Sequence, residues 1–395
     1  MKICKPEILN QENEIVFRVC VESSEVAETL WYSIEEKFGD FVTDFCDAPL
    51  LALLIPAMAK GEDLYIAGTI SERLWYNVSG PYQRLLRYII PSLRQVKIIP
   101  EQVQARDQRA PGVATGFSCG IDSYCVLADH CYLDMPPGFK ITHLLFNNVG
   151  SHGKGGERLF WERFSRIKPV ADQLGLPIIR VNSNVDEFYG QGLNFEQTHT
   201  PRNASVPLLL QGGIGRYMYA SAVNYKEVFV GATYRMGYSD TISLPLISTE
   251  ALDAFSVGSE YTRVEKTLRV AEIPDSYSTL DVCIRGDKAG NCSKCWKCMR
   301  TLVTLDIAGL LDRYSDSFDI DAYKKKRGQF LVTLLRSHDP LLREIIDFAE
   351  ERHYPIPLSS RLSARMPYPT SLVKRFIGLP IRVARKLKRV IRGDD

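Results

Sequence analysis

The sequence has no apolar run long enough to cross a membrane. Its longest uninterrupted apolar stretch, residues 49–59, falls well short of the roughly 20 residues that a bilayer helix requires. Residues 1–20 also lack the basic start, the apolar middle and the small-residue cleavage site of a secretory signal. A transmembrane protein and a secreted protein are both disfavoured, and we expect a cytoplasmic location.

Histidine is scarce, and the chain carries little net charge. The six histidines form no pair at metal-binding spacing, so His152 and His199, which lie near candidate loops, receive no role. Lysine and arginine number 49 against 47 aspartates and glutamates, which gives a net charge of +2. The basic residues are concentrated at one end, because residues 361–395 carry ten of them against two aspartates.

The composition is that of a folded protein with more than one domain. Hydrophobic residues make up 45% of the 395 residues and charged residues 24%, which excludes an intrinsically disordered chain. A polar stretch that ends in Pro111-Gly112 predicts a boundary, so we expect a small α/β domain of unreadable role over residues 1–109. The remaining chain is expected to form a ligand-binding domain over 110–310, a helical extension over 311–360 and a basic tail over 361–395.

Short apolar runs alternate with helix-like stretches through the middle of the chain. The β-like runs are residues 113–117, 141–147, 177–181 and 228–230, and the helix-like stretches are residues 122–130, 158–174 and 206–223. This alternation predicts an α/β fold with a doubly wound parallel sheet, whose ligands bind at the carboxyl ends of the strands. Glycines 212, 213 and 215 fall inside a predicted helix, so close packing explains them better than dinucleotide binding does.

The loop after the first of these strands has the composition of a phosphate-binding turn. It consists of Ser118, Cys119, Gly120, Ile121, Asp122 and Ser123. Small residues let successive backbone N–H groups converge on an anion, and the following helix contributes partial positive charge at its N-terminus. The alternative is a turn that merely caps the helix through Asp122 and Ser123.

Four cysteines near the end of this region have metal-binding spacing. They are Cys283, Cys292, Cys295 and Cys298, a C-x8-C-x2-C-x2-C pattern. Four thiolates complete a tetrahedral shell around Zn²⁺ and leave no position for a reactive water, so we expect a structural zinc ion. An iron–sulfur cluster is the main alternative.

The loop of residues 118–123 resembles the Ser-Gly-Gly-x-Asp-Ser loop of the PP-loop ATP pyrophosphatases. Together with the cysteine spacing, it is most similar to the 7-cyano-7-deazaguanine synthase family, which makes a queuosine precursor. Similarity extends to Pro201-Arg202-Asn203 and to residues 228–240 and 263–273. It covers about residues 112–302, and a Gly-Tyr-Pro-Asp-Cys-Arg run expected near Tyr238 is only partly present, which leaves the substrate open.

This resemblance implies an ATP-dependent ligase. Such an enzyme adenylates a carboxylate or similar oxygen, releases pyrophosphate and passes the product to a nitrogen nucleophile, which is ammonia in the resembling family. ATP, Mg²⁺ and Zn²⁺ are the implied cofactors. The loop of residues 118–123 would hold the pyrophosphate, with Asp122 and Ser123 as catalytic residues and Asp122 orienting Mg²⁺.

Other residues are implied at the nucleotide or substrate. Phe146 and Asn147 end the second strand, where the superfamily seats adenine, although Phe146 is equally explained as a core aromatic. Arg202 and Asn203 are expected to reach the phosphates or the substrate, with a helix cap by Asn203 as the alternative. Weaker candidates are Lys154 and Arg158 for the pyrophosphate, Tyr234, Arg235 and Asp240 for the substrate, and Lys266, supported only by its place in a similar segment.

Cys119 stands where the family has glycine, and this leaves other functions open. A cysteine at a helix N-terminus can have a lowered pKa and act as a nucleophile, but a small cysteine can also simply replace glycine. A tRNA-thiolating enzyme would need a sulfur-carrying residue here, and only Cys119 or Cys125 qualifies. A third possibility is a non-catalytic nucleotide-binding module in which Cys119 has abolished turnover.

The basic tail predicts a second binding function. Residues 380–392 place apolar side chains on one helical side and basic ones around the other, which suits anionic lipid or the phosphates of RNA. A solvated end is the alternative. The expected partners are therefore a small-molecule substrate or a carboxyl group of a larger partner, lipid or RNA at the tail, and a second copy of the chain in a homodimer.

Overall fold

The computed structural model describes residues 1–23, 27–106, 108–153, 156–190, 192–284 and 290–366. The chain divides into two compact units, the first spanning Met1–Tyr323 and the second beginning at Lys324. The strands of the described residues all lie in the first unit and belong to one sheet of eleven strands. This sheet carries the loop of residues 118–123, which follows one of its strands.

Five parallel strands form the part of the sheet that carries the candidate site. They are β7 (Gly112–Gly116), β8 (His143–Asn148), β9 (Ile178–Ser183), β10 (Ile214–Ala220) and β11 (Asp253–Val257). Their order across the sheet is β11-β10-β7-β8-β9, with parallel pairing throughout. The chain thus winds outward in both directions from β7, as in a doubly wound sheet. The expected α/β class, with a large and mostly parallel sheet, is confirmed.

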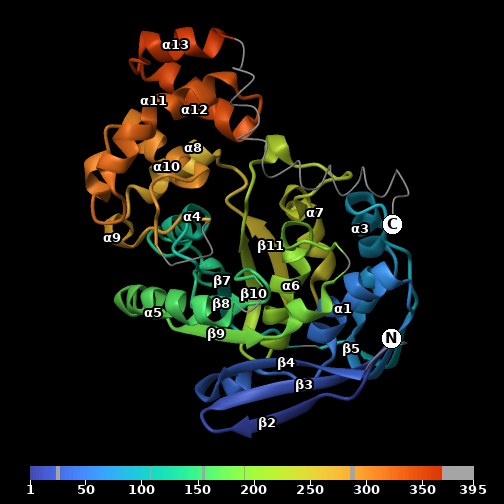
Figure 1. Ribbon diagram of the computed structural model, residues 1–395. Coiled ribbons are helices and arrows are strands. Elements are labelled where there is room, and N and C mark those ends of the chain that lie inside the picture. Colours follow the sequence, from blue (N-terminus) through green and yellow to red (C-terminus); the bar gives the residue numbers. More distant parts are fainter. Residues whose placement is uncertain (24–26, 107, 154–155, 191, 285–289, 367–395) are drawn as a thin grey trace. The chain divides into compact units, whose positions relative to one another are not determined.

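Helices cover both faces of these strands. α4 (Ile121–His130) and α5 (Glu157–Gln173) lie on one face, and α6 (Phe195–Leu209) lies on the other with α1 (Asp47–Lys60) packed against it (Figure 1). Strand β9 is buried along its whole length, as parallel strands between two helical layers are. This double burial is the reason why the strands appear in the sequence as short continuous apolar runs.

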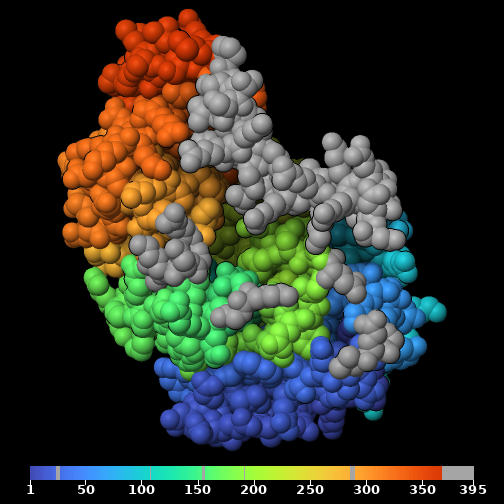
Figure 2. Space-filling model, viewed as in Figure 1, coloured from blue at the N-terminus to red at the C-terminus, as the bar shows by residue number. Residues whose placement is uncertain are grey.

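The N-terminal residues extend the same sheet. Their strands are β1 (Lys2–Ile3), β2 (Glu7–Gln11), β3 (Glu14–Glu22), β4 (Ala27–Glu35), β5 (Leu64–Ser71) and β6 (Ile98–Gln104). β4 pairs antiparallel with β9, so the edge of the parallel strands is completed by residues far earlier in the chain. The space-filling view shows these residues in direct contact with the parallel-strand region (Figure 2). The expected boundary near residue 109 therefore does not separate two compact units.

A buried carboxylate also ties the N-terminal residues to the rest of the unit. The side chain of Asp47, at the start of α1, is fully buried. It accepts hydrogen bonds from the backbone N–H of Ser71 at 2.8 Å and from Nε2 of Gln211 at 2.9 Å. These partners satisfy an acceptor that would otherwise be costly to bury. They join α1, β5 and the turn before β10.

The chain between residues 206 and 230 differs from the prediction. The expected helix over 206–223 is wrong, because α6 ends at Leu209 and the chain returns as strand β10. The expected strand over 228–230 is irregular. The glycines mark the beginning of β10, where a Cβ on Gly213 would lie 2.3 Å from the ring of Phe41 and one on Gly215 would lie 2.0 Å from the carbonyl oxygen of Ala110. Close packing was the correct interpretation of these glycines, on the wrong element.

The remaining elements are helices. In the first unit they are α2 (Glu72–Ser79), α3 (Pro81–Ile89), α7 (Asp240–Ser243), α8 (Arg263–Val270), α9 (Ser276–Thr279) and α10 (Trp296–Ile307). α11 (Ile320–Arg336) leads into the second unit, which holds α12 (Pro340–Glu351) and α13 (Leu358–Arg365). Within the described ranges no helix is both long and apolar enough to span a bilayer. The predicted basic helix lies outside the described residues.

Candidate nucleotide site and cysteine cluster

The loop of residues 118–123 lies at the point where the strand order reverses. It leaves the carboxyl end of β7 and leads into α4, while the next strand on one side, β10, comes from much later in the chain. Doubly wound sheets bind their ligands at this switch point, because the connections from neighbouring strands diverge there. The position of the loop between strand and helix is the one that the sequence predicts.

Two backbone amides of the loop point toward one hydroxyl. The N–H groups of Ser118 and Gly120 donate to Oγ of Ser123 at 3.4 and 3.1 Å, and this hydroxyl donates to the carbonyl oxygen of Gly120 at 3.0 Å. Cys119 between them has a φ of +57°, in the left-handed region that favours glycine. Converging amides of this kind form an anion-binding concavity. A phosphate oxygen would take the two amide hydrogens from the Ser123 hydroxyl.

Two cationic side chains from α8 hold the carboxylate of Asp122. Nη2 of Arg263 lies 2.8 Å from one oxygen and Nζ of Lys266 lies 3.2 Å from the other. Burial raises the pKa of Asp122, but the charges of Arg263 and Lys266 outweigh this effect and lower the pKa to about 2. Asp122 is therefore a stable carboxylate at neutral pH.

The same two cations also reach the end of β10. Lys266 is 2% exposed, and its Nζ donates to the carbonyl oxygen of Ser221 at 2.5 Å. Nη2 of Arg263 donates to the carbonyl oxygen of Ala222 at 3.4 Å. Because Ser221 and Ala222 directly follow β10, the pair bridges the carboxyl ends of β7 and β10. Burial lowers the pKa of Lys266, and the charge of Asp122 opposes this shift.

α10 brings two further cations to this region. Burial lowers the pKa of Lys297, the charges of Glu196 and Asp122 oppose this shift, and those of Arg300 and Arg263 add to it. Arg300 is 5% exposed, and its guanidinium lies 4.9 Å from the centre of the Trp296 ring. We call Arg263, Lys266, Lys297 and Arg300 the cationic cluster. Arg263, Lys297 and Arg300 were not predicted from the sequence, and Lys266 had no independent support there, although the three-residue spacings within α8 and α10 place each pair on one helical face.

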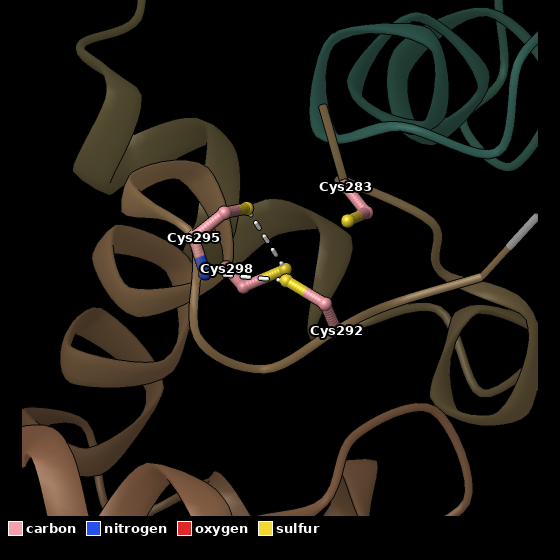
Figure 3. A group of neighbouring side chains, drawn as sticks. All are labelled: Cys283, Cys292, Cys295 and Cys298. Carbon is pink, nitrogen blue, oxygen red and sulfur yellow. Dashed lines mark hydrogen bonds between the residues drawn. The ribbon is translucent and has the colours of Figure 1, made fainter. Parts of the chain in front are cut away.

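The four predicted cysteines come together in the structure (Figure 3). Their sulfur atoms all lie within 4.8 Å of one another, and Sγ of Cys295 is 3.4 Å from Sγ of Cys298. Tetrahedral Zn–S bonds of about 2.3 Å place sulfur atoms about 3.8 Å apart, so small movements would bring all four onto one ion. Cys295 and Cys298 belong to the start of α10, which also carries Lys297 and Arg300. The donor set therefore fits a structural zinc ion.

Phe146 lies in an aromatic core. Its side chain is 5% exposed and stacks on Phe160, with ring centres 5.1 Å apart and planes inclined by 3°. Phe164 and His152 complete the cluster between β8 and α5. The structure thus favours the core interpretation over a direct contact with adenine.

Arg202 and Asn203 occupy different surroundings despite their adjacency. Arg202 is 1% exposed, pairs with Asp186 and lies 3.6 Å from the centre of the Tyr189 ring, which gives it a structural role. Asn203 does not cap α6, because Asn194 is the residue that does so. Instead Nδ2 of Asn147, at the end of β8, donates to Oδ1 of Asn203 at 3.5 Å. Asn203 therefore reaches the edge of the sheet where a ligand would bind, whereas Arg202 does not.

The weaker candidates are mostly scattered. Arg158 is highly exposed and lies 3.6 Å from Glu162, as expected for a solvated helix pair. Tyr234 is 78% exposed, whereas Asp240 is 1% exposed and accepts a hydrogen bond from Thr200 at 2.6 Å. Lys154 lies outside the described residues. These positions do not assemble into one site.

The cysteines near the loop are poor nucleophiles. Cys119 is 3% exposed and Cys125 is 1% exposed, and burial raises the pKa of each thiol to about 12. Burial therefore shifts the pKa of Cys119 in the direction opposite to the one that a nucleophilic role for this thiol requires. The candidate site instead offers backbone amides, Asp122 and the cationic cluster. No protein-family model, no curated protein and no solved structure matches the chain.

Proposed function

We propose that the protein is an ATP-dependent adenylating ligase. In this proposal the loop of residues 118–123 binds ATP, and cleavage between the α and β phosphates transfers AMP to a carboxylate or similar oxygen of the substrate. A nitrogen nucleophile then displaces AMP. The observation that carries the proposal is the position of Arg263 and Lys266 at the loop, where both cations pair with the loop carboxylate Asp122, whose charge also reaches Lys297 of α10.

Charge explains why such a cluster suits a polyphosphate. Arg263 and Lys266 are both buried at the loop, and charges interact strongly in a region of low dielectric, so these two cations favour an anionic ligand there. A triphosphate supplies this anion, and its leaving pyrophosphate gains charge during cleavage. Cations and backbone amides fixed in advance stabilise that developing charge without rearrangement.

Each group has a distinct part in the proposed reaction. The amides of Ser118 and Gly120 hold the pyrophosphate, and the cationic cluster neutralises it. Asp122 would hold Mg²⁺, which prefers carboxylate and phosphate oxygens and supplies further neutralisation. The four cysteines would hold Zn²⁺, which fixes the start of α10 and with it Lys297 and Arg300.

The substrate, the partners and the location belong to the same proposal. Asn147 lies at the end of β8, the strand paired with β7, and is hydrogen-bonded to Asn203, so in this proposal both amides face a small-molecule substrate or a carboxyl-bearing partner. All ten cysteines lie among the described residues and none of them forms a disulfide, which suits the reducing cytoplasm. The buried thiols of Cys119 and Cys125 count against the thiolating alternative.

The test is the appearance of AMP and pyrophosphate. The zinc-loaded protein is incubated with ATP, Mg²⁺ and fractionated cell extract, and both products are measured. We expect Asp122→Asn and Lys266→Met to abolish the signal, because each removes a charge at the loop. Asp172→Asn is the matched control, since Asp172 pairs with Lys168 on exposed α5, away from the loop. ATP binding without any AMP formation would favour a non-catalytic module, and unchanged activity of Asp122→Asn would place the site elsewhere.

A further inference from the structure

The apex of the loop is attached to the segment that carries the cysteines. The backbone N–H of Asp281 donates to the carbonyl oxygen of Cys119 at 2.8 Å. A Cβ added to Gly120 would lie 3.6 Å from the carbonyl oxygen of Asp281, so the two segments are in van der Waals contact. Cys119 is also the residue with the left-handed backbone. Cys119 is thus held by a hydrogen bond from Asp281, which lies two positions before Cys283 in the chain.

The side chain of Asp281 connects two parts of the segment that carries the cysteines. One carboxylate oxygen accepts a hydrogen bond from the N–H of Cys283 at 3.2 Å, and the other accepts one from the N–H of Gly290 at 3.0 Å. Arg166 of α5 lies 3.7 Å from the second oxygen. Asp281 therefore connects the residues around Cys283 to the residues just before Cys292.

A neighbouring amide reinforces this connection. Oδ1 of Asn291 accepts a hydrogen bond from the N–H of Val282 at 2.9 Å, and its Nδ2 donates to the carbonyl oxygen of Leu280 at 2.6 Å. The two chain segments that deliver Cys283 and Cys292 are thus held together next to the loop. A metal ion bound by the four thiolates would lock both segments to α10.

We propose that Asp281 is a positioning residue that couples metal occupancy of the cysteine cluster to the conformation of the phosphate-binding loop. With the metal bound, Asp281 presents its N–H to Cys119 and holds the loop in its left-handed turn. Without the metal, the segment moves and the loop loses this support. The effect on nucleotide affinity rests on the proposed function, whereas the effect on loop conformation does not.

Hydrogen exchange measures the coupling directly. Amide exchange is followed in peptides covering residues 118–124 and 280–284, for the zinc-loaded full chain and after removal of zinc by a chelator. We expect zinc removal to speed exchange of both peptides at least tenfold, while peptides of β8 are unaffected. Unchanged exchange of residues 118–124 in the zinc-free protein would overturn the proposal.

Variants separate Asp281 from the metal itself. Asp281→Ala keeps all four thiols, so it should retain one equivalent of zinc, yet its loop should exchange as fast as that of the zinc-free wild type. Chelation should then add little, because the coupling is already lost. A loop that responds to chelation equally in Asp281→Ala and in the wild type would contradict the proposal. Asp281→Asn, which keeps one acceptor, is used if Asp281→Ala fails to fold, and exposed Asp312→Ala is the matched control.

Nucleotide binding distinguishes this inference from the proposed function. If the wild type binds ATP, the zinc-free protein and Asp281→Ala should both bind it about tenfold more weakly, and Asp312→Ala should bind it normally. If the wild type binds no ATP but its loop responds to zinc and to Asp281→Ala, the proposed function fails and the coupling stands. If ATP binds equally to all forms, the predicted effect on nucleotide affinity is wrong while the proposed function stands, and hydrogen exchange alone decides whether the loop is coupled to the metal.

Discussion

Asp122 shows that the position of a residue can be predicted from the sequence when its partners cannot. Its position in the loop was predictable, because the strand-to-helix turn is local. Its partners Arg263 and Lys266 were not, since they lie 141 and 144 residues further along the chain. No local pattern joins them to the loop. The sequence therefore predicted an anion-binding loop, but of the cations near it only Lys266 was named, and only because of its place in a similar segment.

The low pKa of Asp122 makes a contribution to stability that depends on pH. Its pKa is about 2 in the folded protein and about 3.9 in an unfolded chain, so the carboxylate stabilises the fold above about pH 4 and this contribution is lost as the pH falls to about 2. As the pH falls across this interval, we expect the free energy of unfolding to decrease by about 2 kcal/mol less in Asp122→Asn than in the wild type. Urea unfolding at several pH values measures the difference, and parallel curves for the two proteins would contradict the assignment.

Cys119 provides a second test at a single position. Glycine relieves a left-handed turn that costs a non-glycine residue about 1–2 kcal/mol, but it loses the buried thiol and adds unfolded-state entropy. We expect Cys119→Gly to change the free energy of unfolding by less than about 1 kcal/mol and to retain nucleotide binding. Nucleotide-binding and activity assays with this variant show whether the thiol is required. Complete loss of activity despite normal folding would support a nucleophilic role for Cys119.

At the scale of elements, the sequence predicted strands better where burial was uniform. The apolar runs that became β7, β8 and β9 are short and have polar or turn residues on both sides, so their extent was clear. The residues of β10 follow α6 after only a short turn and are equally apolar, so a single helix over 206–223 fitted the same pattern. What separates the two elements is the close approach of Phe41 and Ala110, which lie far away in the chain.

Gly213 tests this account of the turn before β10. A methyl group at Gly213 would overlap the ring of Phe41, so we expect Gly213→Ala to destabilise the protein by about 1–3 kcal/mol through overpacking. Gly190→Ala is the control, because a Cβ there meets no atom within 4 Å. Chemical denaturation of both variants gives the comparison. Equal stability of the two would show that the packing at Phe41 yields easily.

At the scale of the whole molecule, a shared sheet replaces the expected domain boundary. The polar stretch near residue 110 does mark a change, because it precedes β7, the first of the five parallel strands that carry the candidate site. Strand pairing between β4 and β9 and the burial of Asp47 beside Gln211 nevertheless make one unit of Met1–Tyr323. Such pairings join residues about 150 positions apart and leave no signal in a single sequence.

Removal of the N-terminal residues tests this unity. A chain lacking residues 1–109 would expose the edge of β9 and the face of α6 that α1 covers. We expect it to be insoluble or to unfold without cooperativity, because an open strand edge and a bared apolar face both promote aggregation. Soluble expression and thermal unfolding of this fragment are compared with those of the full chain. A soluble, cooperatively folding fragment would show that residues 1–109 form a separate domain after all.

The central claim is that the loop and the cationic cluster together bind the polyphosphate of ATP. The most direct measurement is calorimetric titration of the zinc-loaded protein with an ATP analogue whose bridging oxygen between the α and β phosphates is replaced by a methylene group. We expect binding that weakens roughly tenfold or more in Lys266→Met and in Arg263→Met, as for loss of a buried charged partner of a phosphate, and that is unaffected in Asp172→Asn. Equal affinity in the wild type and both cation variants, or no binding at all, would contradict the claim.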